Sequence, residues 1–173
     1  TPSNTIHPDE ELVRSTPTAL SATRSNLAGA SVGNYALFAG GYGSSPTYKD
    51  TVDAYNTDLV RSTPTSLSQS RNRLAGASIG NFALFAGGYD SSHQSTVDAY
   101  DTSLVRSIPT ELSAARGSLA GASVGNYALF AGSGNGSTVD AYDTSLVRSI
   151  PTSLSVARGS LAGASVGNYA LFA

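Results

Sequence analysis

The sequence contains no cysteine, methionine or tryptophan, a single lysine, and few charged residues of either sign. Without cysteine the chain has neither a disulfide framework nor thiolate chemistry. Its 10 basic and 12 acidic residues leave a net charge of -2, so it offers no basic surface for nucleic acid or anionic lipid. No apolar run approaches the roughly 18 residues of a membrane-spanning helix. We therefore expect neither a nucleic-acid nor a membrane partner.

Repetition is what the chain has in abundance. The peptide Leu-Ala-Gly-Ala-Ser begins at Leu27, Leu74, Leu119 and Leu161, so successive copies lie 47, 45 and 42 residues apart. The other intervals within the repeat are constant, and the length variation falls in one segment, covering residues 41–50, 88–95 and 133–137. A period in this range with strand-like patterning predicts propeller blades. One variable loop per repeat indicates a rigid scaffold that presents a variable surface.

Each repeat reads as four short strands. In the third copy the expected strands cover residues 119–124, 127–131, 138–142 and 146–149. Gly125-Asn126 predicts a tight hairpin between the first two, because both residues tolerate positive φ. Pro151 ends the fourth strand, since proline cannot donate to a sheet ladder. Glycine, serine, threonine and proline interrupt the chain too often for a helix, so we expect an all-β fold.

Side-chain size predicts where each strand packs. Leu-Ala-Gly-Ala-Ser is too small to fill a sandwich core, but it suits strands crowded around a central axis. The large side chains of the first copy are Tyr35, Leu37, Phe38, Val52, Tyr55, Leu59 and Val60. We expect them to pack sheet against sheet, each worth about 1.5–3 kcal/mol when buried. One repeat cannot shield both its faces, so its stability depends on neighbouring repeats.

This succession of motifs resembles the kelch repeat. That family carries an arginine before the first strand, a double glycine after the second, and a tyrosine followed by Asp or Asn after the third. The third copy here has Arg116, Gly132-Ser133 and Tyr142-Asp143 in those places. The double glycine is complete in the earlier copies, at Gly40-Gly41 and Gly87-Gly88. The family's fourth-strand tryptophan is absent, and Val60, Val105 and Val147 lie near its place.

The resemblance implies an all-β propeller of four-stranded antiparallel blades. It says little about activity, because kelch propellers include an oxidase, actin-binding proteins, ligase adaptors and bacterial surface or phage-associated proteins. Of these, the highly repetitive chain most resembles the bacterial or phage type. We expect a secreted protein, or one at a cell or virion surface, rather than a cytoplasmic one.

The repeat count predicts one propeller domain of about four blades over residues 1–173. The expected boundaries are 27–73, 74–118 and 119–160 for three blades, with 1–26 and 161–173 sharing a closing blade. Residues 5–15 read as degenerate third and fourth strands, which would complete the last blade and close the ring. Two alternatives remain: two chains sharing blades in an eight-bladed homo-oligomer, and a natural or engineered piece of a longer array whose role is assembly alone.

Charged residues recur at fixed places in the repeat. One arginine series precedes the first strand: Arg24, Arg71, Arg116 and Arg158. A second lies in the fourth strand: Arg14, Arg61, Arg106 and Arg148. The third strand carries Asp53, Asp98 and Asp140. Either arginine series would make a ring of anion-binding guanidiniums. With a net charge near zero, we expect instead that one series pairs with the aspartates.

Two further sets of polar residues have simple explanations. Asn56, Asp101 and Asp143 follow the third strand, and we expect Asx turns there. A calcium site would need six to eight oxygens and an Asp-rich loop with a suitably placed glycine, which the sequence lacks. His7 and His93, the two histidines, occur in unlike contexts and read as exposed loop residues. We expect no metal and no cofactor.

Two classes of function remain. The first is a non-catalytic binding or structural module whose variable loops contact a protein or a glycan. The loop residues that would make the contact are Tyr42, Tyr48, Lys49, Tyr89, Asp90, His93 and Gln94. The second is an enzyme with a site at the central opening. No catalytic motif occurs, and the loops supply few titratable groups. The binding module is therefore the favoured hypothesis.

Overall fold

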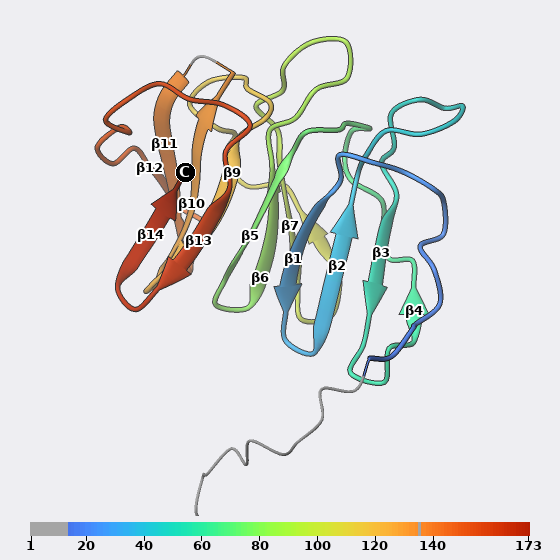
Figure 1. Cartoon of the computed structure of the whole chain (residues 1–173). Helices are drawn as coiled ribbons and strands as arrows, with labels where there is room; N and C mark the ends of the chain where they lie inside the picture. The colour runs from blue at the N-terminus through green and yellow to red at the C-terminus, as the bar shows by residue number, and fades with distance from the viewer. Residues whose placement is uncertain (1–13, 135) are drawn as a thin grey trace, which may run out of the picture.

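A computed structural model describes residues 14–134 and 136–173, and within them the chain forms antiparallel sheets without a helix (Figure 1). Sheet 1 contains β1 (Ala28–Val32), β2 (Tyr35–Ala39), β3 (Val52–Tyr55) and β4 (Arg61–Ser62). Sheet 2 contains β5 (Ala75–Ile79), β6 (Phe82–Ala86), β7 (Val97–Asp101) and β8 (Arg106–Ser107). Sheet 3 contains β9 (Ala120–Val124), β10 (Tyr127–Ser133), β11 (Gly136–Asp143) and β12 (Arg148–Ser149). Sheet 4 contains β13 (Gly163–Val166) and β14 (Tyr169–Phe172). The all-β prediction is confirmed.

Tight Gly-Asn turns join the first and second strand of every sheet, as predicted. The glycines have φ between 51° and 53°, at Gly33, Gly80, Gly125 and Gly167. The asparagines that follow them have no positive φ, so the glycine alone adopts the left-handed conformation, as at the first central position of a type II′ turn. All four turns lie at one end of the sheets, opposite the loops that join the second and third strands (Figure 1).

The predicted Asx turns after the third strands are confirmed. Asp143 Oδ1 accepts hydrogen bonds from the backbone N–H groups of Ser145 and Val147, both at 2.9 Å. The equivalent side chains at Asn56 and Asp101 accept the same two bonds in the earlier copies. These side chains therefore shape the chain for the return to the fourth strand.

The fourth strands are shorter than predicted, with two residues each. The prediction that Leu146 and Val147 belong to the strand is wrong, because the Asx turn holds Leu146 at a φ of 62° and delays pairing until Arg148. The expectation that Leu59 and Val60 pack between sheets is also wrong, since their exposed fractions are 41% and 60%. Val105 and Val147 are exposed to the same degree as Val60, and each of these valines belongs to an Asx turn rather than to a paired strand.

Neighbouring sheets pack face to face through one repeated arrangement. The face of sheet 1 that carries Leu37 and Ala54 meets the face of sheet 2 that carries Phe85 and Tyr100. The corresponding residues between sheets 2 and 3 are Leu84, Ala99, Phe130 and Tyr142. Each of these eight side chains is buried. A sheet therefore uses both faces, one against the preceding repeat and one against the following repeat.

The first strands of the repeats crowd together as their small side chains predict. β1, β5, β9 and β13 lie side by side in chain order (Figure 1). A Cβ on Gly76 would lie well inside van der Waals contact of the Gly29 carbonyl oxygen, and the same holds for Gly121 against Gly76 and for Gly163 against Gly121. Ser31 N–H donates to Ser78 Oγ at 3.0 Å, and Ser78 N–H donates to Ser123 Oγ at 3.1 Å. Glycine allows the close approach and serine bonds across it.

The expected closed ring is not seen among the described residues, where no sheet closes on itself and sheet 4 has two strands. Residues 1–13, which were expected to supply strands of the closing blade, lie outside the described residues. Closure by the N-terminal segment therefore stays a prediction. What the structure establishes is four separate sheets, one built from each repeat.

The close approach of the first strands predicts the effect of adding one methyl group. Gly76→Ala should lower the free energy of unfolding by about 1–3 kcal/mol, because its Cβ would overlap a backbone carbonyl that no rotamer can move. Gly134→Ala is the matched control, since nothing lies within 4 Å of a Cβ built there. Urea unfolding followed by circular dichroism measures both. Equal stability of the two variants would contradict this packing.

Candidate functional site

The loops between second and third strands lie together at one edge of the molecule (Figure 1). We call this the variable-loop edge and define it by residues 41–50, 88–95, 133–134 and 136–137. Its most ordered feature is a row of four rings, Tyr42, Tyr48, Tyr89 and His93, which we call the aromatic row. Successive ring centroids lie 5.8, 6.1 and 5.6 Å apart, all edge to face. The row crosses from the loop of sheet 1 to the loop of sheet 2.

Backbone hydrogen bonds fix the tyrosines at both ends of this crossing. Tyr42 exchanges two backbone bonds with Ser25, each 2.8 Å long, and Tyr89 exchanges two with Asn72, at 2.8 and 3.0 Å. Ser25 and Asn72 belong to the segments that lead into first strands. The variable loops are thus tied to the constant part of the repeat directly beside their aromatic residues.

The double glycines explain how the loops leave the sheets. Gly40 has a φ of 68° and Gly41 a φ of 123°, conformations that other residues rarely adopt. Gly41 N–H donates to the carbonyl oxygen of Arg71 at 2.9 Å, and a Cβ on Gly40 would press against the same carbonyl. The glycine pair therefore brings the loop of one sheet against the connection to the next.

Of the seven predicted binding residues, four carry rings that are exposed or half-buried, and three have polar side chains that are hydrogen-bonded within the structure. Tyr42 is 45% exposed, His93 is exposed, and Tyr48 and Tyr89 are half-buried. Lys49, in contrast, is buried and its Nζ donates to the carbonyl oxygen of Ser44 at 2.7 Å. Asp90 accepts hydrogen bonds from the side-chain amides of Gln94 at 2.5 Å and Gln69 at 2.7 Å. Lys49, Asp90 and Gln94 therefore shape the loops, because their polar groups already have partners.

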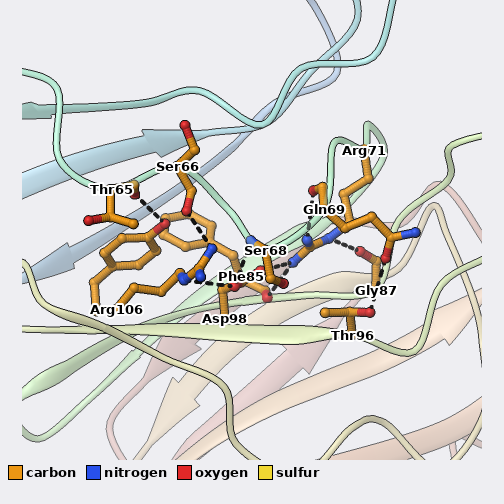
Figure 2. A network of polar contacts seen from close by, with 11 residues as sticks. Thr65, Ser66, Ser68, Gln69, Arg71, Phe85, Gly87, Thr96, Asp98 and Arg106 are labelled. Atoms are coloured by element: carbon orange, nitrogen blue, oxygen red, sulfur yellow. Dashed lines mark hydrogen bonds and ion pairs between the residues drawn. The ribbon is translucent and has the colours of Figure 1, made fainter.

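The predicted pairing of arginines with aspartates is present below this edge. Arg71 and Asp98 form a fully buried ion pair, with Nη2 to Oδ2 at 2.8 Å (Figure 2). The other guanidinium nitrogens of Arg71 donate to the carbonyl oxygens of Gly87 at 2.7 Å and Gln69 at 3.1 Å. Asp98 Oδ1 accepts the backbone N–H of Ser68 at 3.0 Å. All groups of this buried pair are hydrogen-bonded, which is the condition for a charge to be tolerated inside a protein.

The buried ion pair repeats in the neighbouring sheets. The equivalent pairs are Arg24 with Asp53 at 2.7 Å and Arg116 with Asp140 at 2.5 Å. The second arginine series approaches the same aspartates at their other oxygen, at 3.6, 3.8 and 3.4 Å for Arg61, Arg106 and Arg148. Both series therefore converge on one carboxylate per sheet, whereas the sequence suggested that only one would. Among the described residues no anion-binding ring results, since Arg24, Arg71 and Arg116 of the first series are buried.

Arg158, the fourth member of the first series, differs from the others. Its Nη1 donates to the carbonyl oxygen of Phe172 at 3.5 Å. Within residues 14–134 and 136–173 no carboxylate lies within 4.0 Å of it. The aspartate that pairs with Arg24, Arg71 and Arg116 comes from a third strand, and sheet 4 consists of a first and a second strand.

Sequence reasoning expected the third-strand tyrosine to pack between sheets but missed the hydrogen bond that its hydroxyl group makes. Tyr100 Oη donates to the carbonyl oxygen of Thr65 at 2.8 Å, and Tyr142 Oη donates to that of Thr110 at 2.8 Å. The acceptors belong to the peptide Pro-Thr-x-Leu-Ser, which occurs in all four repeats, beginning at Pro17, Pro64, Pro109 and Pro151. Its constancy is the signal that could have indicated a role. The serine of this peptide also binds the aspartate, as Ser68 and Ser113 show.

No protein-family model and no curated protein matches the chain. In the described part of the chain, no group of three His, Cys, Asp or Glu side chains is placed to hold a metal ion. That part also contains no helix with the length and apolar character needed to cross a membrane. His7 lies outside the described residues.

The buried tyrosines predict how stability changes in alkaline solution. Burial, and to a smaller extent the neighbouring Asp98 and Asp140, raise the pKa of Tyr100 and Tyr142 well above the ordinary value of 10.0. The unfolded chain releases these phenol protons above about pH 10 while the folded chain keeps them. The free energy of unfolding should therefore fall as the pH rises through that range.

Urea unfolding between about pH 9 and pH 11 tests this dependence. The double variant Tyr100→Phe and Tyr142→Phe should show a flatter decline, although each substitution costs about 1 kcal/mol because it leaves a carbonyl without its donor. Tyr169→Phe, at a side chain that is 70% exposed, is the control. An unchanged decline in the double variant would show that other groups cause it.

Proposed function

We propose that this chain is a non-catalytic binding module built on a kelch-like propeller, and that its variable-loop edge contacts a protein or a glycan. The observation that carries the proposal is the aromatic row, which joins the loops of two sheets into one surface. Tyrosine gives a large, rigid contact area with a polar tip at a low cost in conformational entropy, so it is favoured at recognition surfaces.

A cavity that all four repeats line together supports the propeller arrangement. It has a volume of about 240 Å³ and is lined by equivalent pairs of residues: Asn26-Leu27, Arg73-Leu74, Ser118-Leu119 and Ser160-Leu161. The N–H groups of Arg73, Ser118 and Ser160 each donate to the carbonyl oxygen of the equivalent residue one repeat earlier, at 2.9 Å. Identical bonds between equivalent positions are expected around a propeller axis. Asn26 and Ser160 lie at the two ends of this series of bonds, and a ring of four blades would make them neighbours.

The separation of constant frame and variable loop also supports recognition at this edge. The hydrogen bonds of Tyr42 and Tyr89 to the frame place an aromatic side chain at the same point of two loops that differ in length. The shortest loop, 133–137, contains no aromatic residue. It should therefore contribute least to a contact made through tyrosine anchors.

The proposal is tested by binding of the labelled chain to glycan and protein arrays. Tyr42→Ala, Tyr48→Ala and Tyr89→Ala should each weaken the strongest signal at least about tenfold, because aromatic anchors dominate such surfaces. Unfolding by urea should remain cooperative, since these residues lie outside the four sheets. A signal on the glycan array would identify the partner of this edge as a glycan, and a signal on the protein array would identify it as a protein.

Variants at the opposite end of the sheets provide the matched control. Asn34→Ala, Asn81→Ala and Asn126→Ala alter the Gly-Asn turns and should leave the signal unchanged. Loss of binding in these variants, with no effect of the tyrosine variants, would place recognition at the other end. No signal on either array would count against a binding role.

A further inference from the structure

Sheet 4 has an open edge at β14. In the other three sheets the second strand pairs with a first strand on one side and with a third strand on the other. Among the described residues β14 pairs with β13 alone. Its exposed fractions include 70% for Tyr169 and 52% for Leu171. An unpaired edge of this kind is a template for another extended segment.

Within the part of the chain that the structure describes, the charge at this edge lacks its usual partner. Arg24, Arg71 and Arg116 each bind an aspartate that lies opposite a second-strand phenylalanine, as Asp53 lies opposite Phe38 in the register of sheet 1. The corresponding phenylalanine of sheet 4 is Phe172, whose carbonyl oxygen accepts from Arg158. A third strand in the same register would place an aspartate opposite Phe172 and next to the guanidinium of Arg158.

An apolar cavity lies where a tyrosine would follow that aspartate. It has a volume of about 280 Å³ on the face of sheet 3 and is lined by Val124, Tyr127, Leu129, Ala141, Ser149 and Pro151. In sheet 2 the equivalent positions include Ile79, Leu84 and Ala99, which pack with Tyr142 in one core cluster. In sheet 1 they include Val32, Leu37 and Ala54, which pack with Tyr100. The cavity on sheet 3 is therefore the third copy of a tyrosine pocket.

The last repeat also contains a counterpart of the carbonyl group that accepts the tyrosine hydroxyl. Thr18, Thr65 and Thr110 accept the hydroxyl groups of Tyr55, Tyr100 and Tyr142 through their carbonyl oxygens. Thr152 occupies the same position of Pro-Thr-x-Leu-Ser in the last repeat. The edge of β14, Arg158, the cavity and Thr152 thus form four parts of one arrangement. Its strand pairing, ion pair and hydroxyl bond are each seen three times in the same molecule, and its tyrosine pocket is seen filled twice.

We propose that these four parts form a docking site for an extended segment of the sequence Val-Asp-Ala-Tyr. The segment adds to β14 as a third strand, with its aspartate on Arg158 and its tyrosine in the cavity. Main-chain hydrogen bonds hold such a segment, and the two side chains give it specificity. The occupant is a third strand with the repeat's own chemistry.

The N-terminal segment of this chain has a different chemistry. Aligned on Leu12-Val13-Arg14-Ser15, it carries Ile6 at the aspartate position and Pro8 at the tyrosine position. Isoleucine cannot accept a hydrogen bond from Arg158, and proline neither fills an aromatic pocket nor donates to the ladder. The site therefore selects a Val-Asp-Ala-Tyr strand over this segment.

Binding of a synthetic peptide to the full chain tests the site. The probe is fluorescently labelled Ser-Thr-Val-Asp-Ala-Tyr-Asp-Thr-Ser-Leu-Val-Arg-Ser, the sequence of residues 137–149, and the readout is fluorescence anisotropy. We expect saturable binding. A peptide with asparagine for the first aspartate, and one with alanine for the tyrosine, should each bind at least about tenfold more weakly, because each loses a buried partner. Hydrogen exchange should show new protection of the amides of β14.

Variants of the chain distinguish specific binding at this site from nonspecific binding. Arg158→Gln should weaken binding of the native peptide and remove the difference in affinity between the native and the asparagine peptide. Arg73→Gln, at an exposed arginine, should leave the affinity and this difference unchanged. Circular dichroism checks that the variants are folded, and the peptide substitutions leave the chain itself unchanged. No binding up to about 1 mM, or equal binding of all three peptides, would overturn the proposal. Binding only to a chain that lacks residues 1–13 would make the N-terminal segment the occupant and would also overturn it.

Discussion

A carboxylate buried in the third strand is the interaction on which the rest of this structure depends. Asp98 binds the guanidinium of Arg71 and the backbone of Ser68, and both of these residues lie on the connection that arrives from the preceding repeat. Because removing one partner of a buried ion pair typically costs about 3–5 kcal/mol, no sheet can keep this aspartate without the connection that covers it. The repeat is therefore a unit of sequence, whereas the unit of stability is a sheet together with the segment before it.

This division explains why one loop is free to vary. Most contacts between repeats use the first strands, the packed faces of the sheets, the Pro-Thr-x-Leu-Ser connection and the third-strand aspartate. The variable-loop edge adds the aromatic row and the bond from Gly41 to the Arg71 carbonyl oxygen. A change of loop length leaves the frame intact as long as the paired glycines and the backbone bonds of residues such as Tyr42 and Tyr89 remain. The same division is visible in sheet 4. Among the described residues, Arg158 and an apolar cavity lack the third strand that completes their equivalents.

Features set by local chemistry could be predicted from the sequence, and features set by contacts between repeats could be predicted only in part. The first three strands of a repeat, the Gly-Asn turns and the Asx turns follow from the backbone preferences of a few residues, whereas the fourth strands are shorter than the sequence predicts. The pairing of Arg71 with Asp98 followed from charge balance, but the convergence of Arg106 on the same carboxylate needs the position of a neighbouring strand. Val60 was expected to be packed between sheets, but it lies in an Asx turn and is exposed. Lys49 was expected to contact a partner, but it is buried and donates to a carbonyl oxygen of its own loop.

The central claim is that one kind of contact joins every repeat to the next around a common axis, and Gly29→Ala tests it most directly. In the described residues the nearest neighbours of a Cβ on Gly29 would be the Phe38 ring and the Leu37 carbonyl oxygen, at 3.7–3.8 Å, which is ordinary contact. In a ring, a first strand would pack against β1, and Gly29 would press on its carbonyl as Gly76 presses on that of Gly29. The account predicts that Gly29→Ala lowers the free energy of unfolding by about 1–3 kcal/mol, as overpacking does. A variant as stable as the parent chain would contradict closure around the axis.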